Sequence, residues 1–99
     1  MANPGLKHGI WVGTEAGVVT TGRVRILAII YYVNADGDTC VIYDGSNTDE
    51  LMTLTHSTAK NNVIITFGNG GKVFPDGLYI NSITANSKIY IIPASGQLE

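Results

Sequence analysis

The chain has 99 residues, a formal net charge of −2 and an apolar fraction of 44%. This length suits one domain that builds a single core without disulfide or metal staples. Only 14% of the residues are charged, well below the roughly 25% of soluble domains, so neutral polar residues must hydrate the surface. Such a surface suits a subunit packed in an assembly. The few Lys and Arg are scattered, which argues against nucleic-acid binding through phosphate groups.

Cysteine usage and the N-terminal sequence bear on the compartment. The single cysteine, Cys40, lies in an apolar run and cannot form an internal disulfide, which excludes a disulfide-stapled secreted domain. The segment MANPGLKHGI lacks the apolar region of a signal peptide, so we expect none. No apolar run approaches the roughly 20 residues needed to span a bilayer, and we expect no membrane partner.

The chain is predicted to be β throughout. β-branched and aromatic residues fill short runs, and Gly, Asn and Asp interrupt these runs at fairly even intervals. The runs predict eight strands, at residues 9–12, 17–21, 24–33, 40–44, 51–56, 63–67, 78–84 and 88–93.

Several junctions between these strands have the chemistry of tight turns. Residues 34–38 form a hairpin loop in which Gly37 can adopt a positive φ. Residues 85–87 form a second hairpin, where Asn86 tolerates the left-handed region. Residues 75–77 read Pro-Asp-Gly, which is typical of a tight turn.

Eight short, evenly spaced strands predict an antiparallel β-sandwich of the jelly-roll type, with a small closed barrel as the alternative. We expect residues 9–97 to form this single domain. Residues 1–8 are predicted to be an N-terminal arm, which either orders on a partner or frays. Residues 98–99 are left out of the fold as a cloning remnant. Charges that would protect the sheet edges are scarce, which favours an oligomer that covers them.

The strand at 24–33 is the most informative element, because at period two both of its faces are apolar. One face carries Val24, Ile26, Ala28, Ile30 and Tyr32. The other carries Leu27, Ile29, Tyr31 and Val33, with Arg23 and Arg25 at its open end. A strand in a small antiparallel domain buries one face and exposes the other to water. A chain of 99 residues has few other segments that could cover both faces. We therefore predict a contact with another protein chain through Leu27, Ile29, Tyr31, Val33 and Trp11.

Metal-ligating patterns are weak in this sequence. His8 and His56 are far apart, and Cys40 belongs to an apolar strand, so no ligand pair has zinc spacing. Asn34, Asp36 and Asp38 copy the first oxygen positions of a calcium loop, but the glycine required at position six is missing. We expect a solvated hairpin there and no metal or cofactor.

Catalytic patterns are equally weak. The glycine-rich segment at 68–72 lacks the flanking residues and the following helix of a phosphate-binding loop. No G-x-S-x-G nucleophile elbow is present, and the carboxylates lie mostly in predicted turns. We expect no enzymatic activity. A deep pocket that converges on His8 or His56 beside a carboxylate would favour an enzyme instead.

Carbohydrate binding remains an alternative, because aromatic rings offer flat surfaces for sugars. The candidates are Trp11, Tyr31, Tyr32, Tyr43, Tyr79 and Tyr90. The other interpretation is that these rings fill the core and a subunit contact. Tyr31 and Tyr32 are adjacent, so their rings point to opposite sides of a strand.

The C-terminal third carries a resemblance. Residues 73–80, VFPDGLYI, followed by residues 87–92, SKIYII, resemble a recurring pattern in small all-β virion proteins of tailed bacteriophages. In those proteins a Gly-Leu-Tyr strand precedes a closing strand rich in Tyr and Ile. The segment TCVIYDG at 39–45 is similar to the strand and turn that commonly come before it.

This resemblance implies a virion structural subunit with no chemistry of its own, of the capsid decoration (cement) type. It implies a homotrimer that is made in the host cytoplasm, sits in the virion and clamps the major capsid protein through shape, apolar contact and added strands. The alternative within the same class is a carbohydrate-binding or receptor-binding β-sandwich module of a phage tail.

Overall fold

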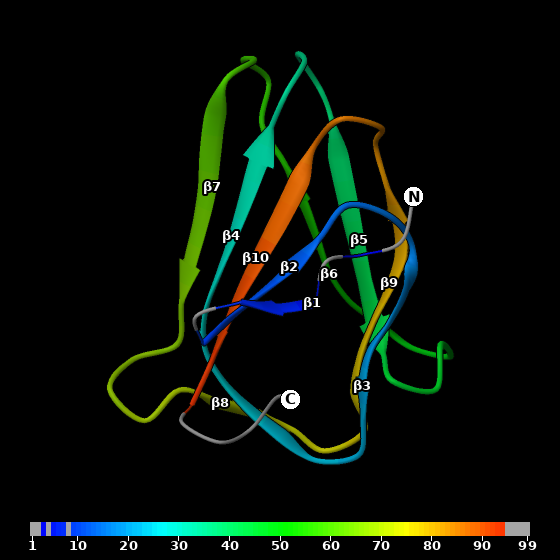
Figure 1. Ribbon diagram of the computed structural model, residues 1–99, viewed down its shortest axis with the longest axis vertical. Coiled ribbons are helices and arrows are strands. Elements are labelled where there is room, and N and C mark those ends of the chain that lie inside the picture. The colour runs from blue at the N-terminus through cyan, green and yellow to red at the C-terminus, as the bar shows by residue number, and fades with distance from the viewer. Residues whose placement is uncertain (1–2, 4, 8, 95–99) are drawn as a thin grey trace.

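The structure is a computed structural model that describes residues 3, 5–7 and 9–94, and within these the chain forms strands and no helix (Figure 1). The strands in chain order are β1 (Gly5–Lys7), β2 (Ile10–Gly13), β3 (Gly17–Thr21), β4 (Val24–Val33), β5 (Thr39–Asp44), β6 (Glu50–Thr55), β7 (Asn61–Thr66), β8 (Lys72–Phe74), β9 (Gly77–Ile83) and β10 (Lys88–Pro93).

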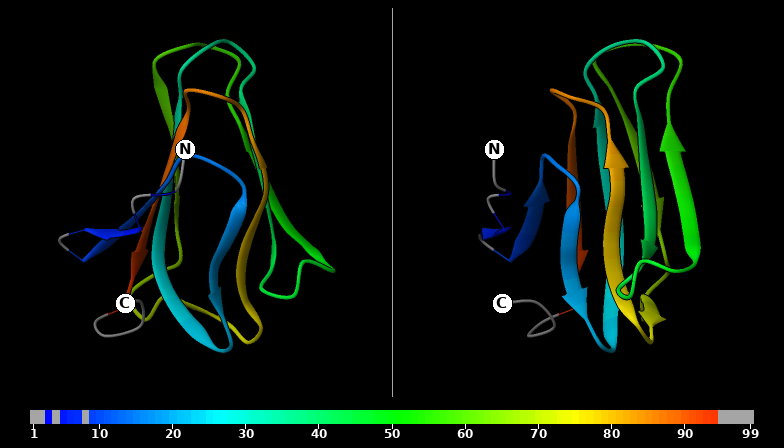
Figure 2. Two further views of the ribbon diagram at one scale, coloured as in Figure 1. Left: turned by 45° about the vertical axis from the view of Figure 1, so that its right-hand side comes forward. Right: turned by 90° about the vertical axis from the view of Figure 1, so that its right-hand side faces the viewer.

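These strands form two antiparallel sheets. The six-stranded sheet has the order β1-β2-β10-β4-β7, with β8 also paired to β4, and the four-stranded sheet has the order β3-β9-β5-β6. The left view of Figure 2 shows the sheets as two layers, and the right view shows the four-stranded sheet face-on, in front of the other. The orders β2-β10-β4-β7 and β3-β9-β5-β6 are those of two interleaved Greek keys, the jelly roll.

The predicted antiparallel β-sandwich is therefore confirmed. Among the described strands no ladder joins one sheet to the other, so the alternative of a closed barrel does not apply. All eight predicted strands are present with small shifts at their ends, and β1 and β8 are additional. β8 pairs with residues 24–26 of β4 and β7 with residues 28–33, so the two share one side of β4.

The predicted N-terminal arm is part of the sandwich where the structure describes it. Gly5–Lys7 forms β1 and pairs with β2. The Asn3 side-chain oxygen accepts hydrogen bonds from the backbone N–H groups of Thr14 and Glu15, at 2.6 and 2.8 Å. These contacts hold the start of the chain against the loop between β2 and β3. The rest of the arm, and residues 98–99, lie outside the described residues.

Strand β4 changes its inward-facing side in the middle. Ile26 pairs with Pro93 and Ala28 pairs with Ile92, so β4 has one more residue than β10 across this step, at Leu27. An extra residue of this kind is a β-bulge, and it reverses which alternate residues face the core. The inward residues are Val24, Ile26, Ile29, Tyr31 and Val33, all 0% exposed.

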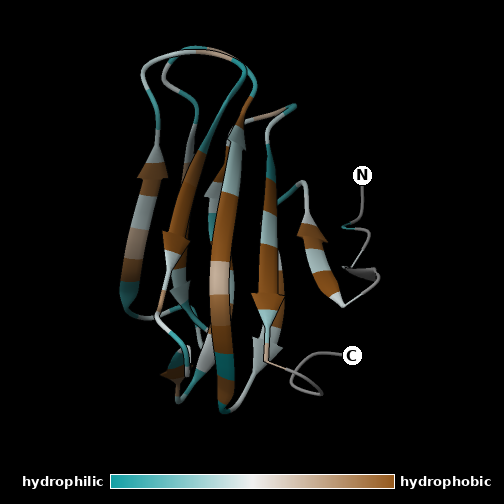
Figure 3. Ribbon diagram, turned by 90° about the vertical axis from the view of Figure 1, so that its left-hand side faces the viewer, coloured by the Kyte–Doolittle hydropathy of each residue, from teal (hydrophilic) through white to brown (hydrophobic). Residues whose placement is uncertain are grey.

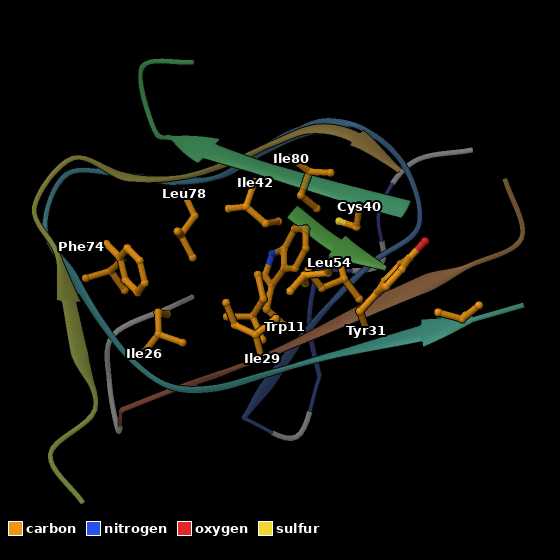
Figure 4. Packing of buried hydrophobic residues seen from close by; sticks show 14 residues of the cluster. Trp11, Ile26, Ile29, Tyr31, Cys40, Ile42, Leu54, Phe74, Leu78 and Ile80 are labelled. Carbon is orange, nitrogen blue, oxygen red and sulfur yellow. The ribbon is translucent and has the colours of Figure 1, made fainter. Parts of the chain in front are cut away.

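The core fills the space between the two sheets, and Figure 4 shows Trp11 in the middle of it. The Tyr31 hydroxyl lies at the end of this core, where it donates to the Ser87 hydroxyl at 2.9 Å. Beyond the inward residues of β4, the buried apolar side chains are Trp11, Cys40, Ile42, Leu54, Phe74, Leu78, Ile80, Ile89 and Ile91.

Substitution of Gly77 by alanine tests the turn that leads into β9. Gly77 has φ +83°, and a Cβ there would collide with the carbonyl oxygen of Thr20 on β3. Gly37 has a similar φ of +80°, but nothing lies within 4 Å of its Cβ position. The left-handed conformation costs an L-residue about 1–2 kcal/mol at either site. We expect Gly77→Ala to lower the free energy of unfolding clearly more than Gly37→Ala, as measured by urea denaturation. Equal losses would contradict the close approach of β3 to Gly77.

Candidate functional site

Within the described residues, the candidate ligand and nucleophile side chains take part in local structure. The described residues contain no group of three or more His, Cys, Asp or Glu side chains that could hold a metal ion. Burial raises the pKa of the Cys40 thiol to about 12, so this thiol stays protonated and unreactive near neutral pH. His56 accepts a hydrogen bond from the backbone N–H of Thr58 within its own turn. His8 lies outside the described residues.

In the hairpin at residues 34–38, whose spacing resembles the start of a calcium-binding loop, the carboxylates accept hydrogen bonds from backbone N–H groups. Asp38 accepts the N–H groups of Asn34 and Ala35, at 3.1 and 2.9 Å. Asp36 accepts the N–H of Ala59, in the loop between β6 and β7, at 2.6 Å. These oxygens therefore shape two neighbouring loops at one end of the sandwich.

The glycine-rich segment at 68–72 connects β7 to β8. The Gly70 carbonyl accepts a hydrogen bond from the Arg25 guanidinium at 2.9 Å, and a strand follows instead of a helix. This arrangement does not present backbone N–H groups at a helix N-terminus, which phosphate binding in a glycine-rich loop uses.

A surface hollow of about 500 Å³ lies between the β2–β3 loop and the β9–β10 loop. It is lined by Thr14, Glu15, Ala16, Ile83, Ala85, Asn86, Ser87 and Lys88. His56 is not among these residues, and His8 lies outside the described residues. The lining offers hydroxyl, amide and backbone groups for hydrogen bonding, the carboxylate of Glu15 and the ammonium group of Lys88.

The predicted contact residues of β4 lie in the core, which corrects the sequence-based expectation. Ile29, Tyr31 and Val33 are 0% exposed, Trp11 is 5% exposed, and Leu27 is half-buried at the bulge. The bulge is the physical reason, because it turns the second half of β4 over relative to a regular strand. These buried side chains are not available to a partner.

The outward side of the same strands is apolar instead. Tyr90 on β10 pairs with Val12 on β2 and with Ile30 on β4, and Ile30 pairs with Ile64 on β7. This row of four side chains crosses the six-stranded sheet, and Ile64 is 63% exposed. We call the surface the apolar outer face and define it by Ile10, Val12, Ala28, Ile30, Tyr32, Ile64, Tyr90 and Ile92.

Figure 3 views the molecule from the side of the apolar outer face and shows apolar segments on neighbouring strands. The outward side of an antiparallel sheet is usually polar and hydrated. Contiguous apolar residues at the surface, by contrast, mark interaction surfaces. On this face Ile64 is exposed and the other seven residues are half-buried. This sheet is therefore the candidate binding surface of the molecule.

The four-stranded sheet has a second outward surface with a different character. Tyr79 on β9 pairs with Tyr43 on β5 and with Val18 on β3, and Tyr43 pairs with Glu50 on β6. Val18 is 52% exposed and Leu51, next to Glu50, is 39% exposed. We call this surface the tyrosine face, and define it by Val18, Val41, Tyr43, Leu51 and Tyr79.

The six aromatic candidates for sugar stacking thus separate into three groups. Trp11 and Tyr31 are in the core, while Tyr32 and Tyr90 lie on the apolar outer face. Tyr43 and Tyr79 alone among the six belong to the tyrosine face.

Comparison with protein-family models, curated proteins and solved structures finds no match to this chain. Across the described residues, no helix has both the length and the apolar character required to traverse a bilayer.

Aspartate substitutions at Ile29 and Ile64 separate the core from the outer face. Ile29→Asp buries a carboxylate without a partner, which costs several kcal/mol, so we expect the protein to unfold. Ile64→Asp places the same charge on an exposed site, and the folded spectrum and melting temperature should change little. Circular dichroism measures both. A stable Ile29→Asp variant, or an unfolded Ile64→Asp variant, would contradict the inward and outward assignment.

Proposed function

We propose that this protein is a non-enzymatic structural subunit of a phage virion, a capsid decoration protein that reinforces the head through protein–protein contacts. The observation that carries the proposal is the apolar row Val12, Tyr90, Ile30 and Ile64 across the six-stranded sheet. The resemblance of residues 73–92 to small virion proteins supports the phage assignment.

A binding role through the apolar outer face is consistent with the energetics of assembly. Each square ångström of apolar surface removed from water contributes about 25 cal/mol, and a stable interface buries about 1,600 Å² in total. A sheet face also meets a partner with little loss of backbone freedom, because its strands are already ordered by their ladders. The proposed partners are further copies of the chain, as a homotrimer, and the major capsid protein.

Co-sedimentation with capsids that lack the protein tests this proposal. We expect the wild-type protein to pellet with such capsids and Ile64→Asp to remain mostly in the supernatant, because the added charge must be desolvated at the contact. Ser57→Asp is the matched control, since Ser57 is exposed in the β6–β7 loop and belongs to neither outer face. It should bind like the wild type. Wild-type protein that stays in the supernatant would contradict the decoration role.

One observation favours a second candidate, a carbohydrate-binding module of a phage tail. Tyr43 and Tyr79 are directly paired across two strands of the tyrosine face, and Asn81, Ser82 and Thr53 lie on the same two or neighbouring strands. Rings side by side on a flat sheet offer stacking area for a sugar, and nearby amide and hydroxyl groups offer hydrogen bonds.

A glycan array distinguishes this candidate. If sugars bind here, Tyr79→Ala abolishes binding, while Tyr90→Ala, which removes a ring from the opposite sheet, leaves it unchanged. Trp11→Ala is not a useful test, because this side chain lies in the core and its loss would destabilise the fold. A wild-type protein that binds no glycan on the array would remove this candidate.

A further inference from the structure

Charged residues are divided between the two sheets. All Lys and Arg residues within the described strands belong to the six-stranded sheet, and all Asp and Glu residues within them belong to the four-stranded sheet. On the outward sides, Arg25 and Lys88 are exposed on the first and Glu50 is exposed on the second. Lys72 is exposed as well, but it pairs with the inward-facing Ile26. Asp49 and Asp76, in the loops at one end of the four-stranded sheet, are exposed as well. On the outward sides of the strands, the apolar outer face thus carries cations and the tyrosine face carries a carboxylate, while the exposed Arg23, in the β3–β4 turn, lies at the same end as Asp76.

The two surfaces also match in width. The apolar row Val12–Tyr90–Ile30–Ile64 crosses four neighbouring strands, and the row from Val18 through Tyr79 and Tyr43 to β6 crosses four as well. Because strands lie about 4.8 Å apart, each row is roughly 14 Å wide. Both rows combine aliphatic side chains with tyrosine, which suits the centre of an interface.

We infer that the apolar outer face of one copy docks on the tyrosine face of a second copy of this chain. The opposite charges around the two faces attract each other, whereas two apolar outer faces would bring Lys88 and Arg25 of each copy toward like charges. Two tyrosine faces would likewise oppose Glu50 with carboxylates. Charge complementarity therefore selects a contact between different faces over a contact between identical ones.

A contact between different faces has a definite consequence for symmetry. Two-fold dimers join the same patch of both subunits, whereas a head-to-tail contact closes into a ring or continues as an open stack. The inference rests on the proposed assembly function and names the partner surface for it. It excludes a two-fold dimer through either face. Because the two faces lie on opposite sides of the sandwich, the contact favours an open stack of copies over a closed ring.

Cysteine cross-linking between differently tagged copies tests the contact. Tyr90→Cys places a thiol near the centre of the apolar outer face, and Tyr79→Cys places one near the centre of the tyrosine face. Central positions meet whatever the in-plane rotation of the two copies. The native Cys40 does not compete, because it is buried and its thiol pKa is about 12. A short bismaleimide should cross-link the two variants when they are mixed. It should give no cross-linked product with either variant alone.

Two outcomes would overturn the inference. Product from Tyr90→Cys alone, or from Tyr79→Cys alone, would show that identical faces meet. No product in any sample would show that neither face forms a contact between copies. Replacing a tyrosine removes apolar contact area and could itself weaken the contact. A second pair of variants, Ile64→Cys and Val18→Cys, therefore places the thiols at exposed sites of the two faces, and the same outcomes apply to it.

Charge-reversal variants test the same contact independently, through the direction in which they change self-association. Lys88→Glu weakens self-association, seen as a lower average mass in sedimentation velocity, if the opposite face carries carboxylates. If two apolar outer faces meet, the same variant does not weaken self-association: a repulsion between Lys88 and Arg25 of the other copy becomes an attraction, and Lys88 against Lys88 exchanges one like-charge pair for another. Glu50→Lys should also weaken it, and the double variant should recover part of the loss. A wild-type protein that is monomeric at all concentrations, or whose mass stops at a dimer, would refute the inference.

The tests of self-contact and the capsid-binding test of the proposed function can give different answers. Cross-linking between different faces without capsid binding would retain the inference and remove the decoration role. Capsid binding by a protein that does not cross-link would do the reverse.

Discussion

The bulge at Leu27 determines which side chains of β4 face the core and which face outward from the six-stranded sheet. At this point β4 exchanges one neighbour for another, since β8 pairs with its first residues and β7 with the remainder. The Leu27 carbonyl accepts the N–H of Phe67, where β7 ends, at 3.1 Å. The extra residue lets Val24 and Ile26 face the core beside β8, and Ile29, Tyr31 and Val33 face it beside β7. Without it, the second half of β4 would turn Ile30 and Tyr32 toward the core and Ile29, Tyr31 and Val33 outward.

Much of the fold follows from patterns that a single sequence displays. Short β-branched runs and the turn chemistry at Gly37, Asn86 and Gly77 place eight of the strands and indicate a sandwich. The residues of β1 and β8 carry no such pattern, because three-residue strands are too short to show period two. The pairing orders are set by contacts between distant segments, and local periodicity does not encode them.

The candidate surface was partly predictable. That β4 has more apolar residues than one face of a small domain needs is visible in the sequence. Which of them face outward is not, because counting at period two assumes a regular strand and the bulge breaks that count. The short strands were better guides, since Tyr90 and Ile64 each lie between inward-facing neighbours on regular strands. In the structure Ile30 faces outward together with its register partners Tyr90 and Ile64.

The positions of the few charged residues bear on how the chain associates. A domain with so few Lys, Arg, Asp and Glu residues has little electrostatic protection against association, and a random distribution would leave both sheets nearly neutral. Among the strand residues, the outward cations Arg25 and Lys88 lie on one apolar surface and the outward carboxylate of Glu50 lies on the other, on opposite sides of one sandwich. Each surface then repels its own kind and attracts the other, so the charges direct association that the apolar rows drive. The same division makes glycan binding and self-contact competitors for Tyr79, because a ring covered by a neighbouring copy is not available to a sugar.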